Sequence, residues 1–541
     1  MAARPPAPRC LDVLSAAPPR RPLTHRWRTG DAPRRGFVRG RHVARALRNI
    51  DRIPDQTVSF AVIPGHLPRP APPAGAERVS STLSPAPTTG LDGSAPDIRA
   101  GRLSAAQYTQ HFGDAAPLLT RTQALVEAER CLYCHDAPCA TACPTGIDVP
   151  SFIRRIAEDN LRGAAKTILE SNPLGGTCAR VCPTEVLCEQ VCVRTTQQGK
   201  PVEIGRLQRY AVDAVMDKPV DALFKRAAPT GQRIGIVGAG PAGLACAFGL
   251  ARLGHEVVLH DARPKGGGLN EYGLASYKTA GGFAQRELEW LMSLGGITLR
   301  CDWRLDSAAQ LQALRSEFDA VYLAVGLTRT EPLGLPGEDL AGVRDAVDFI
   351  AELLQTPDKA ALPIGRRVVV IGGGMTAIDA AVQSKLLGAE EVHMVYRRGP
   401  ETMGASAAEQ DWAQTNGVTI HHWLAPQAMI GDAGRLMAVR FARQRLLDGK
   451  LVPDGTHELF SADMLLRAVG QKLDTRTLDG AGLTLQAGRI VADADGRTGA
   501  EGLWAGGDCR LGGRDLTVEA VEDGKRAARS IHASLSPSMH I

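Results

Sequence analysis

No apolar run in the 541 residues approaches the ~18 residues that a membrane-spanning helix needs, so no membrane span is predicted. No secretory signal peptide precedes the cysteines, and a chain of this length forms a sufficient core without covalent cross-links, so a disulfide framework is not expected. A hydrophobic content of 44% and a charged content of 22% are typical of globular proteins. The length predicts about three or four domains, and we expect a cytoplasmic protein.

Lysine is absent from the first hundred residues, which hold 16 arginines and seven acidic residues. This segment accounts for more than the whole net charge of +5, so the rest of the chain has no basic excess that would indicate nucleic-acid binding. It is rich in proline and alanine and lacks helical or strand periodicity, which predicts a disordered extension over residues 1–103. The alternatives are a targeting segment, which the prolines disfavour because such segments form amphipathic helices, and a translation start downstream of Met1.

Cysteine, in contrast, is concentrated in one short segment that holds eight of the chain's twelve. They form the run Cys131-x2-Cys134-x4-Cys139-x3-Cys143-Pro144, then Cys178-x3-Cys182-Pro183 and Cys188-x3-Cys192. Closely spaced cysteines that end in Cys-Pro are typical of chains holding two iron–sulfur clusters, where the last cysteine crosses to the second cluster. Structural zinc is the alternative, and the nucleotide-binding signatures that follow disfavour it, because a redox-inert ion would have no electrons to pass on.

The region around these cysteines predicts a small α-helical domain over residues 104–228. Residues 118–129 form an expected helix that leads into the first cysteine. Apolar residues at helical spacing follow from Ile153 to Ile168, and the break at Pro173-Leu174-Gly175-Gly176 ends this pattern.

Residues 229–362 carry a first signature of dinucleotide binding. An apolar strand over 234–237 leads into a glycine-rich loop, a helix and a second strand that ends at Asp261. The glycines allow a tight turn and the close approach of a pyrophosphate, and the acid accepts hydrogen bonds from ribose hydroxyls. We expect this to be the first part of an FAD-binding domain. The expected binding residues are Gly238, Gly240, Pro241, Ala242, Gly243, Asp261, Gly268 and Leu269.

The same pattern recurs over residues 363–470, which predicts an inserted NAD(P)-binding domain. Its second strand ends at Arg397-Arg398 without an acid at the ribose position. Guanidinium groups at this position suit a 2′-phosphate and favour NADP over NAD, unless the two arginines only form a solvated strand end. The expected binding residues are Gly372, Gly374, Met375, Thr376, Ala377, Arg397 and Arg398.

A third pattern lies in residues 471–541, which we expect to complete the FAD-binding domain. An apolar strand ends in Gly506-Gly507-Asp508, and a helix begins near Thr517. An acid at the end of such a strand can bind a flavin's ribityl hydroxyls, and a helix N-terminus can stabilise negative charge on the reduced ring. The alternative is an ordinary strand, loop and helix.

These parts together predict an electron carrier. Nicotinamides deliver electrons in pairs and clusters accept them singly, so a flavin is expected to convert between the two. Hydride transfer of this kind needs no protein acid, base or nucleophile, and no catalytic residue is predicted. The expected cofactors are FAD, two [4Fe-4S] clusters and NAD(P)H.

Several motifs resemble the amino-terminal half of dihydropyrimidine dehydrogenase, and most closely the separate electron-input subunit of the bacterial NAD-dependent enzyme. The resemblance covers roughly residues 118–535. It rests on Cys131-Leu-Tyr-Cys134, Ala137-Pro138-Cys139, Cys143-Pro144-Thr145, Asn172-Pro173-Leu174-Gly175, the Gly238–Gly243 loop and Gly506-Gly507-Asp508. It implies an α plus α/β fold, in which an α-helical iron–sulfur domain precedes two Rossmann-like domains.

The resemblance also implies the cluster ligands. The first cluster would be held by Cys131, Cys134, Cys139 and Cys192, and the second by Cys143, Cys182, Cys188 and Gln208. Gln208 lies 16 residues beyond Cys192, where the family has an unusual glutamine ligand. Cys178 is then left over and is expected to pack rather than to bind.

Two features depart from the family pattern. Many relatives have a Gly-Ile-Pro-x-Phe-Arg-Leu-Pro run where this chain has the segment Tyr272 to Lys278, so flavin contacts there stay unassigned. The likeness to an NAD-dependent enzyme also conflicts with the NADP interpretation of Arg397-Arg398.

The complete animal enzyme carries a TIM-barrel FMN domain in which the pyrimidine is reduced. The residues after Gly507 leave no room for the ~250 residues of a barrel. The resemblance therefore implies a hetero-oligomer, with a separate FMN-containing barrel subunit that reduces uracil or thymine. No nucleic-acid or membrane partner is expected.

Three other classes of protein share some of these features. The glutamate synthase small subunit shares every motif except the glutamine at Gln208, where it has an acid. A disulfide reductase of the thioredoxin-reductase type is disfavoured because residues 366–470 contain no cysteine. A zinc-held scaffold would lack clusters and a reducible flavin. The lone Cys10, Cys246, Cys301 and Cys509 are expected to be disordered or packed thiols, and His421-His422 a solvated strand rather than a metal site.

Overall fold

The computed structural model describes residues 98–478 and 480–536. Residues 1–97 of the extension expected over residues 1–103, including Cys10, lie outside the described residues. The prediction of disorder is wrong for residues 98–103. Strand β1 (Ile98–Arg99) pairs antiparallel with β8 (Ile364–Gly365), and Arg102 Nε donates to the carbonyl oxygen of Ile364 at 3.1 Å. These backbone contacts to a segment far along the chain order the residues, and composition alone does not reveal them.

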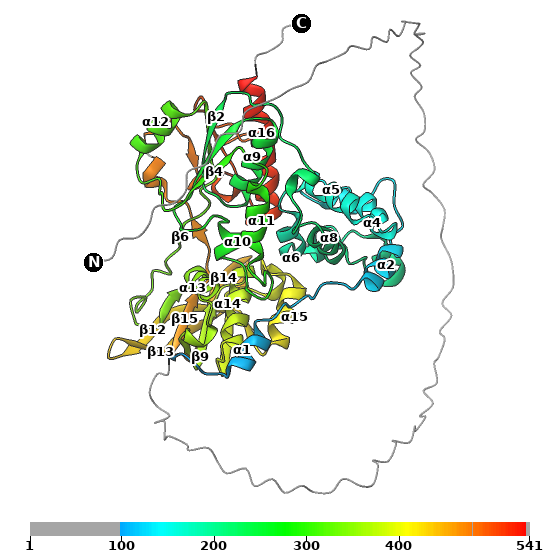
Figure 1. Ribbon diagram of the computed structural model, residues 1–541. Coiled ribbons are helices and arrows are strands. Elements are labelled where there is room, and N and C mark those ends of the chain that lie inside the picture. Colours follow the sequence, from blue (N-terminus) through cyan, green and yellow to red (C-terminus); the bar gives the residue numbers. More distant parts are fainter. Residues whose placement is uncertain (1–97, 479, 537–541) are drawn as a thin grey trace, which may run out of the picture. The chain divides into compact units, whose positions relative to one another are not determined.

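The cysteine region is built of short helices, shown in blue to green in Figure 1. They are α2 (Arg121–Glu129), α3 (Pro138–Ala142), α4 (Val149–Ala157), α5 (Leu161–Ser171), α6 (Gly175–Val181), α7 (Val193–Gln198) and α8 (Ile204–Asp213). Local sequence sets their ends, because Thr120 forms a capping box with Gln123 and the Asp148 carboxylate accepts from the Ser151 amide. The predicted α-helical cluster region is confirmed.

The first nucleotide-binding region is a five-stranded parallel sheet with the order β19-β5-β2-β3-β4. Its strands are β2 (Arg233–Val237), β3 (Glu256–His260), β4 (Ile297–Arg300), β5 (Ala320–Leu323) and β19 (Leu503–Ala505). Its helices are α9 (Pro241–Arg252), α10 (Leu269–Tyr272), α11 (Phe283–Met292), α12 (Ala308–Glu317) and α16 (Thr517–Leu535). Because β19 comes almost 180 residues after β5, the sheet is assembled from two separate pieces of chain.

The second nucleotide-binding region is also a five-stranded parallel sheet, with the order β11-β10-β9-β15-β7. Its strands are β7 (Val343–Asp345), β9 (Arg367–Ile371), β10 (Glu391–Tyr396), β11 (Thr419–His422) and β15 (Met464–Arg467). Its helices are α13 (Ala346–Gln355), α14 (Met375–Leu386) and α15 (Ala407–Thr415). The predicted pair of Rossmann-like folds is confirmed.

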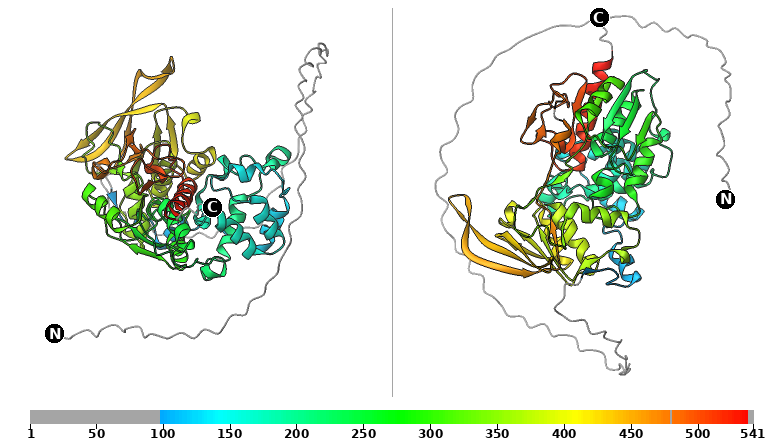
Figure 2. Two further views of the ribbon diagram at one scale, coloured as in Figure 1. Left: turned by 90° about the horizontal axis from the view of Figure 1, so that it is seen from above. Right: turned by 90° about the vertical axis from the view of Figure 1, so that its left-hand side faces the viewer.

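Three long antiparallel strands, yellow to orange in Figure 2, extend from the second sheet. They are β12 (Leu424–Asp432), β13 (Arg435–Leu447) and β14 (Lys450–Ser461), paired in chain order.

The inserted NAD(P)-binding region was expected to begin at residue 363, but its sheet includes a strand from before that residue. Strand β7 and helix α13 precede that residue, yet β7 pairs with β15 of the second sheet. The two connections between the sheets also pair with each other, as β6 (Arg329–Thr330) and β16 (Gln471–Lys472). No glycine-rich signature marks β7, so the sequence offers no sign of this earlier boundary.

Helix α1 (Ala105–His111) packs on the second sheet region, although residues 104–228 were expected to form the iron–sulfur domain. The hydroxyl of Tyr108 donates to the Leu387 carbonyl oxygen at 3.4 Å, and His111 Nδ1 lies 3.0 Å from the Leu386 carbonyl oxygen. This part of the expected domain boundary is therefore corrected.

One continuous apolar core joins the cysteine helices to the first sheet. At its centre Phe224, Phe248 and Trp290 pack with ring centroids 5.7 to 6.3 Å apart. Aromatic groups at this spacing bury large areas and hold their elements in a fixed relation. Across residues 98–478 and 480–536, no helix combines the length and apolar character needed to cross a bilayer.

Candidate cofactor and cluster sites

The first glycine-rich loop forms a cradle at the carboxyl end of the first sheet. Gly238 has φ +104°, and a Cβ there would lie 2.1 Å from the carbonyl oxygen of Ala324. The backbone of Gly268 crosses directly over Gly240, since a Cβ on Gly268 would lie 2.6 Å from the Gly240 Cα. Only glycine allows both approaches, and α9 begins at Pro241 with its amide groups directed at the loop.

Asp261, at the end of β3, is held by two backbone donors. One carboxylate oxygen accepts from the Ala239 amide at 2.8 Å and the other from the Arg263 amide at 2.9 Å. These bonds fix the acid beside the glycine-rich loop, which is the position of a ribose-binding carboxylate. Ala242, Gly243 and Leu269 lie in the first turns of α9 and α10, next to the same loop.

The second piece of the first sheet closes this cradle. The amide of Gly507 donates to the carboxylate of Asp523 of α16 at 2.9 Å. The Thr517 hydroxyl donates to Oδ1 of the buried Asn270 at 3.0 Å. Burial raises the pKa of Asp508 from 3.8 to about 6, and the nearby Asp515 adds to this rise. The loop holding Gly506, Gly507 and Asp508 and the start of α16 thus meet α10, and the residues fit an FAD. Asn270 was not anticipated from sequence.

The second glycine-rich loop repeats the arrangement at the carboxyl end of β9. Gly374 is the N-cap of α14, which opens with Met375, Thr376 and Ala377, and Gly372 follows β9 directly. The ring of Tyr396 covers Gly373, where a Cβ would lie 2.4 Å from the ring. The side chains of Arg397 and Arg398 are exposed just beyond β10, beside this loop. This geometry fits a nicotinamide dinucleotide, with two cations available near its adenosine end.

The segment without a family counterpart connects the two sheets. The hydroxyl of Tyr277 donates to Asp379 of α14 at 3.1 Å, and the ammonium of Lys278 lies 2.8 Å from Asp379 and 3.3 Å from Glu409 of α15. Burial acts to lower the pKa of Lys278, but the two carboxylates together outweigh it and raise the pKa above its ordinary value. The segment is an ionic contact between the flavin and nicotinamide regions, and no short-range signal in the sequence indicates it.

The four cysteines expected at the first cluster line one pocket. Cys131, Cys134, Cys139 and Cys192 surround it with apolar side chains that include Val149 and Ile153. Burial raises the pKa of the Cys139 thiol to about 11, and the neighbouring Cys131 and Cys192 thiols add to this rise. Thiols that oppose one another's ionisation in this way are close neighbours, and a cationic iron–sulfur core would stabilise them as thiolates.

The cysteines expected at the second cluster also converge. A hydrogen bond that the Cys182 thiol donates to Cys178 raises the pKa of Cys182, and burial and the nearby Cys178, Cys188 and Cys143 thiols add to this rise. Gln208 lies on α8 facing α6, where its Nε2 donates to the Gly175 carbonyl oxygen at 2.7 Å. The structure therefore groups Cys178, the expected spare, with the three cysteines expected as ligands and places Gln208 beside the same helix. The assignment of Gln208 as the fourth ligand stays a prediction.

The second group faces the first sheet region. Cys143 Sγ lies 3.3 Å from the Thr145 hydroxyl, and Lys525 of α16 donates to the Thr145 carbonyl oxygen at 3.1 Å. Helix α16 begins at Thr517 in the flavin cradle, so one helix connects the cradle to the Cys143 turn. In residues 98–478 and 480–536, no group of three or more His, Cys, Asp or Glu side chains is arranged to hold a single metal ion.

The remaining cysteines and histidines are placed away from these groups. Cys246 and Cys509 are buried, and Cys301 is half-buried. His421 lies in strand β11 and is half-buried, with its Nε2 3.0 Å from His393 Nδ1 and both rings against Phe460. Pairing of β10 with β11 causes this contact, and the His421-His422 dipeptide alone does not predict it.

Comparison with known proteins matches two families in succession. Residues 108–220 match the family described as dihydropyrimidine dehydrogenase domain II, 4Fe-4S cluster. Residues 232–524 match the family described as pyridine nucleotide-disulphide oxidoreductase.

Relatives align along most of the chain. The NAD-dependent dihydropyrimidine dehydrogenase subunit PreT of Salmonella typhimurium is 33% identical, with 78% of this chain and 97% of the relative covered. The PreT subunit of Escherichia coli K12 gives the same three figures. The glutamate synthase [NADPH] small chain of Halomonas elongata is 31% identical, with 81% of this chain and 95% of the relative covered.

Proposed function

We propose that this chain, which belongs to the pyridine nucleotide-disulphide oxidoreductase family, transfers electrons to a pyrimidine-reducing partner. Its relatives include the PreT subunits, which are iron–sulfur flavoproteins. The cofactors of this family, FAD and [4Fe-4S] clusters, convert a hydride from NAD(P)H into single electrons. The residues of this chain bind and orient these groups. The proposed partner is an FMN-containing TIM-barrel subunit that reduces uracil or thymine to the 5,6-dihydro form.

The contact between α16 and the Cys143 turn carries this proposal. Thr517 at the start of α16 lies in the flavin cradle, and Lys525 two turns later bonds to Thr145 beside Cys143. Short, bonded connections of this kind keep donor and acceptor groups at a fixed separation. This connection supports transfer of electrons from the flavin to the second cysteine group first, because Thr145 is two residues from Cys143.

Glutamate synthase small subunit is the second candidate, because a small chain of that enzyme aligns almost as fully. Gln208 is the observation that favours the pyrimidine branch, since the resemblance implies a glutamine at this position in that branch and an acid in the synthase subunits. The exposed Arg397 and Arg398 support use of NADPH, whereas the PreT relatives are named as NAD-dependent.

Reconstitution with a partner separates the two candidates. The purified chain is mixed with an FMN-containing barrel subunit and NADH or NADPH, and uracil loss is followed anaerobically. We expect dihydrouracil to form only when both subunits are present. Glutamate formation from glutamine and 2-oxoglutarate with a large amidotransferase subunit, without any pyrimidine reduction, would instead establish the synthase function.

A further inference from the structure

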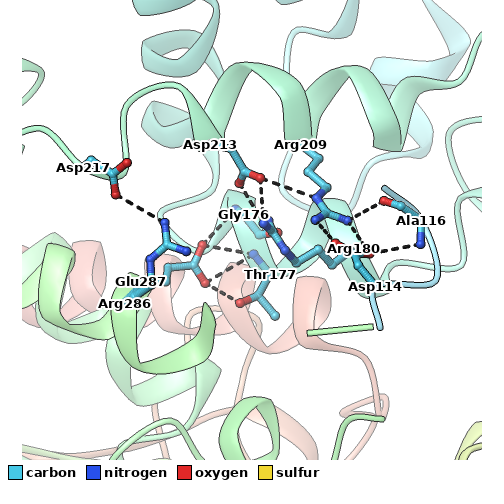
Figure 3. Close-up of polar contacts among 10 residues, drawn as sticks. All are labelled: Asp114, Ala116, Gly176, Thr177, Arg180, Arg209, Asp213, Asp217, Arg286 and Glu287. Atoms are coloured by element: carbon cyan, nitrogen blue, oxygen red, sulfur yellow. Dashed lines mark hydrogen bonds and ion pairs between the residues drawn. The ribbon is translucent and has the colours of Figure 1, made fainter. Parts of the chain in front are cut away.

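Glu287 of α11 is a fully buried acid at the boundary between the flavin sheet and the cysteine helices (Figure 3). One carboxylate oxygen accepts from the backbone amides of Gly176 at 2.8 Å and Thr177 at 3.1 Å. The other accepts from the Thr177 hydroxyl. All three donors belong to the first turn of α6, the helix whose C-cap is Cys182. The flavin region thus supplies an acid to the helix that ends at a predicted cluster ligand.

Opposing effects set the pKa of Glu287. Burial raises the pKa of Glu287 from 4.5 to about 7, while the bonds from Thr177 and Gly176 oppose this rise. Arg180 lies close by, over the ring of Phe283 at 3.4 Å, but its guanidinium donates two hydrogen bonds to Asp213, at 2.9 and 2.8 Å. Asp213, and not Glu287, is therefore the ion-pair partner of Arg180.

Several other charged groups on the elements around Glu287 have partners of opposite charge, and Glu289 of α11 is exposed to solvent. The pairs are Arg209 with Asp114 and Asp213, Arg286 with Asp217, Lys265 with Glu271 of α10, and Arg252 of α9 with Glu170. Among the described residues, Glu287 itself forms no ion pair and depends on the dipolar donors of α6. A buried acid held in this way responds strongly to a change of charge nearby, because little solvent or counter-charge screens it.

We propose that Glu287 is a positioning residue whose protonation is linked to electron transfer between the flavin and the second cysteine group. The proposal rests on the proposed function. One electron from the reduced flavin enters the cluster held by Cys143, Cys182 and Cys188, and one proton from solvent binds to the Glu287 carboxylate. On reoxidation both leave. An ionised Glu287 disfavours the added electron and lowers the reduction potential of this cluster, and a neutral Glu287 does not.

The full chain, with both clusters and FAD bound, provides the test. Reduction potentials are measured by electron paramagnetic resonance at pH values from 6 to 8.5. We expect the potential of the second cluster in the natural protein to fall as pH rises through about 7, because Glu287 then ionises. In Glu287→Gln the potential should not change over this range and should match the low-pH value of the natural protein. Asp217→Asn, which removes an exposed acid at the same boundary, should keep the pH dependence.

Thr177→Val serves as a second variant in case Glu287→Gln does not fold. Loss of the hydroxyl donor makes the ionised carboxylate less favourable, so the fall in potential should move to higher pH. Any one of three results would overturn the inference. The potential of the second cluster in the natural protein could be independent of pH, or the potential of Glu287→Gln could depend on pH as that of the natural protein does. The third result is a Thr177→Val variant in which the potential falls over the same pH range as in the natural protein. A chain that binds no clusters would contradict the proposed function as well, whereas a cluster-containing chain with these unchanged titrations contradicts this inference alone.

Discussion

Gln208 and Cys178 compete for one position beside Cys143, Cys182 and Cys188. The resemblance to dihydropyrimidine dehydrogenase implies Gln208, while the structure brings the Cys178 thiol into hydrogen-bonding contact with Cys182. A thiolate binds iron more strongly than an amide oxygen, but replacing it by a neutral ligand changes the net charge and hence the potential of the cluster. The choice between them therefore changes the redox property of the site and not only its geometry.

Paired substitutions distinguish these two residues. Gln208→Ala should perturb the second cluster only, because the first cysteine group lies elsewhere, so about half the iron or a changed second spectroscopic signal is expected. Cys178→Ala should leave iron content and both spectra unchanged. Iron and sulfide analysis with low-temperature electron paramagnetic resonance measures both. Full iron in Gln208→Ala, together with loss in Cys178→Ala, would assign the position to Cys178.

Asp508 gives the flavin cradle a pH dependence of its own. Its pKa is raised to about 6 by burial and by Asp515, above the ordinary 3.8. Between about pH 4 and 6 the unfolded chain loses this proton before the folded chain does, so the group makes folding less favourable as pH rises. In flavin-free protein, Asp508→Asn should therefore raise the melting temperature relative to the natural chain, and more at pH 7 than at pH 5.

Thermal melts followed by circular dichroism at these two pH values measure the difference. A gain that is equal at pH 5 and pH 7 would contradict the raised pKa. Asp261→Asn is the control, since its carboxylate accepts two backbone hydrogen bonds and its loss should lower stability at both pH values.

Among the elements, local sequence predicts the two units in which a strand, a glycine-rich loop and a helix follow one another. The glycines are what make these units recognisable. Gly238→Ala places a methyl group 2.1 Å from the Ala324 carbonyl oxygen in a left-handed backbone conformation. This overlap should destabilise the fold by more than about 3 kcal/mol and abolish FAD binding. Flavin content after purification and urea unfolding measure both effects.

Gly231→Ala is the matched control for this substitution. Gly231 also has a positive φ, +78°, but a Cβ there meets no atom within 4 Å. Its replacement should cost only roughly 1 kcal/mol and leave FAD bound. Equal losses in the two variants would mean that backbone conformation, and not the close approach to the Ala324 carbonyl oxygen, makes Gly238 necessary.

Sequence predicted the elements better than the contacts between them. The cysteine spacing and both glycine-rich loops are short-range patterns, and the structure places them as pockets and cradles. The Lys278 contact with Asp379 and Glu409, and the bonds from Thr177 to Glu287, join residues more than 100 positions apart. Single acids or lysines at such separations have no pattern of their own. For the same reason the pairing of β7 with the second sheet was missed.

In the whole molecule, each of these long-range contacts lies between two cofactor regions. Lys278 joins the flavin and nicotinamide regions, while Glu287 and Lys525 join the flavin region to the cysteine helices. Their position indicates that they hold the cofactor regions in a fixed relation, as electron transfer over a series of centres requires. The continuous apolar core between the cysteine helices and the first sheet supports the same conclusion.

In the proposed function, electrons from NAD(P)H reach two clusters within this one chain. The most direct measurement is anaerobic purification with analysis of iron, sulfide and flavin, followed by titration with NADH and NADPH in the visible spectrum. We expect about eight iron atoms and one FAD per chain, with both flavin and cluster absorbance bleached by nucleotide. Zinc in place of iron, or a flavin that neither nucleotide reduces, would contradict the proposed function.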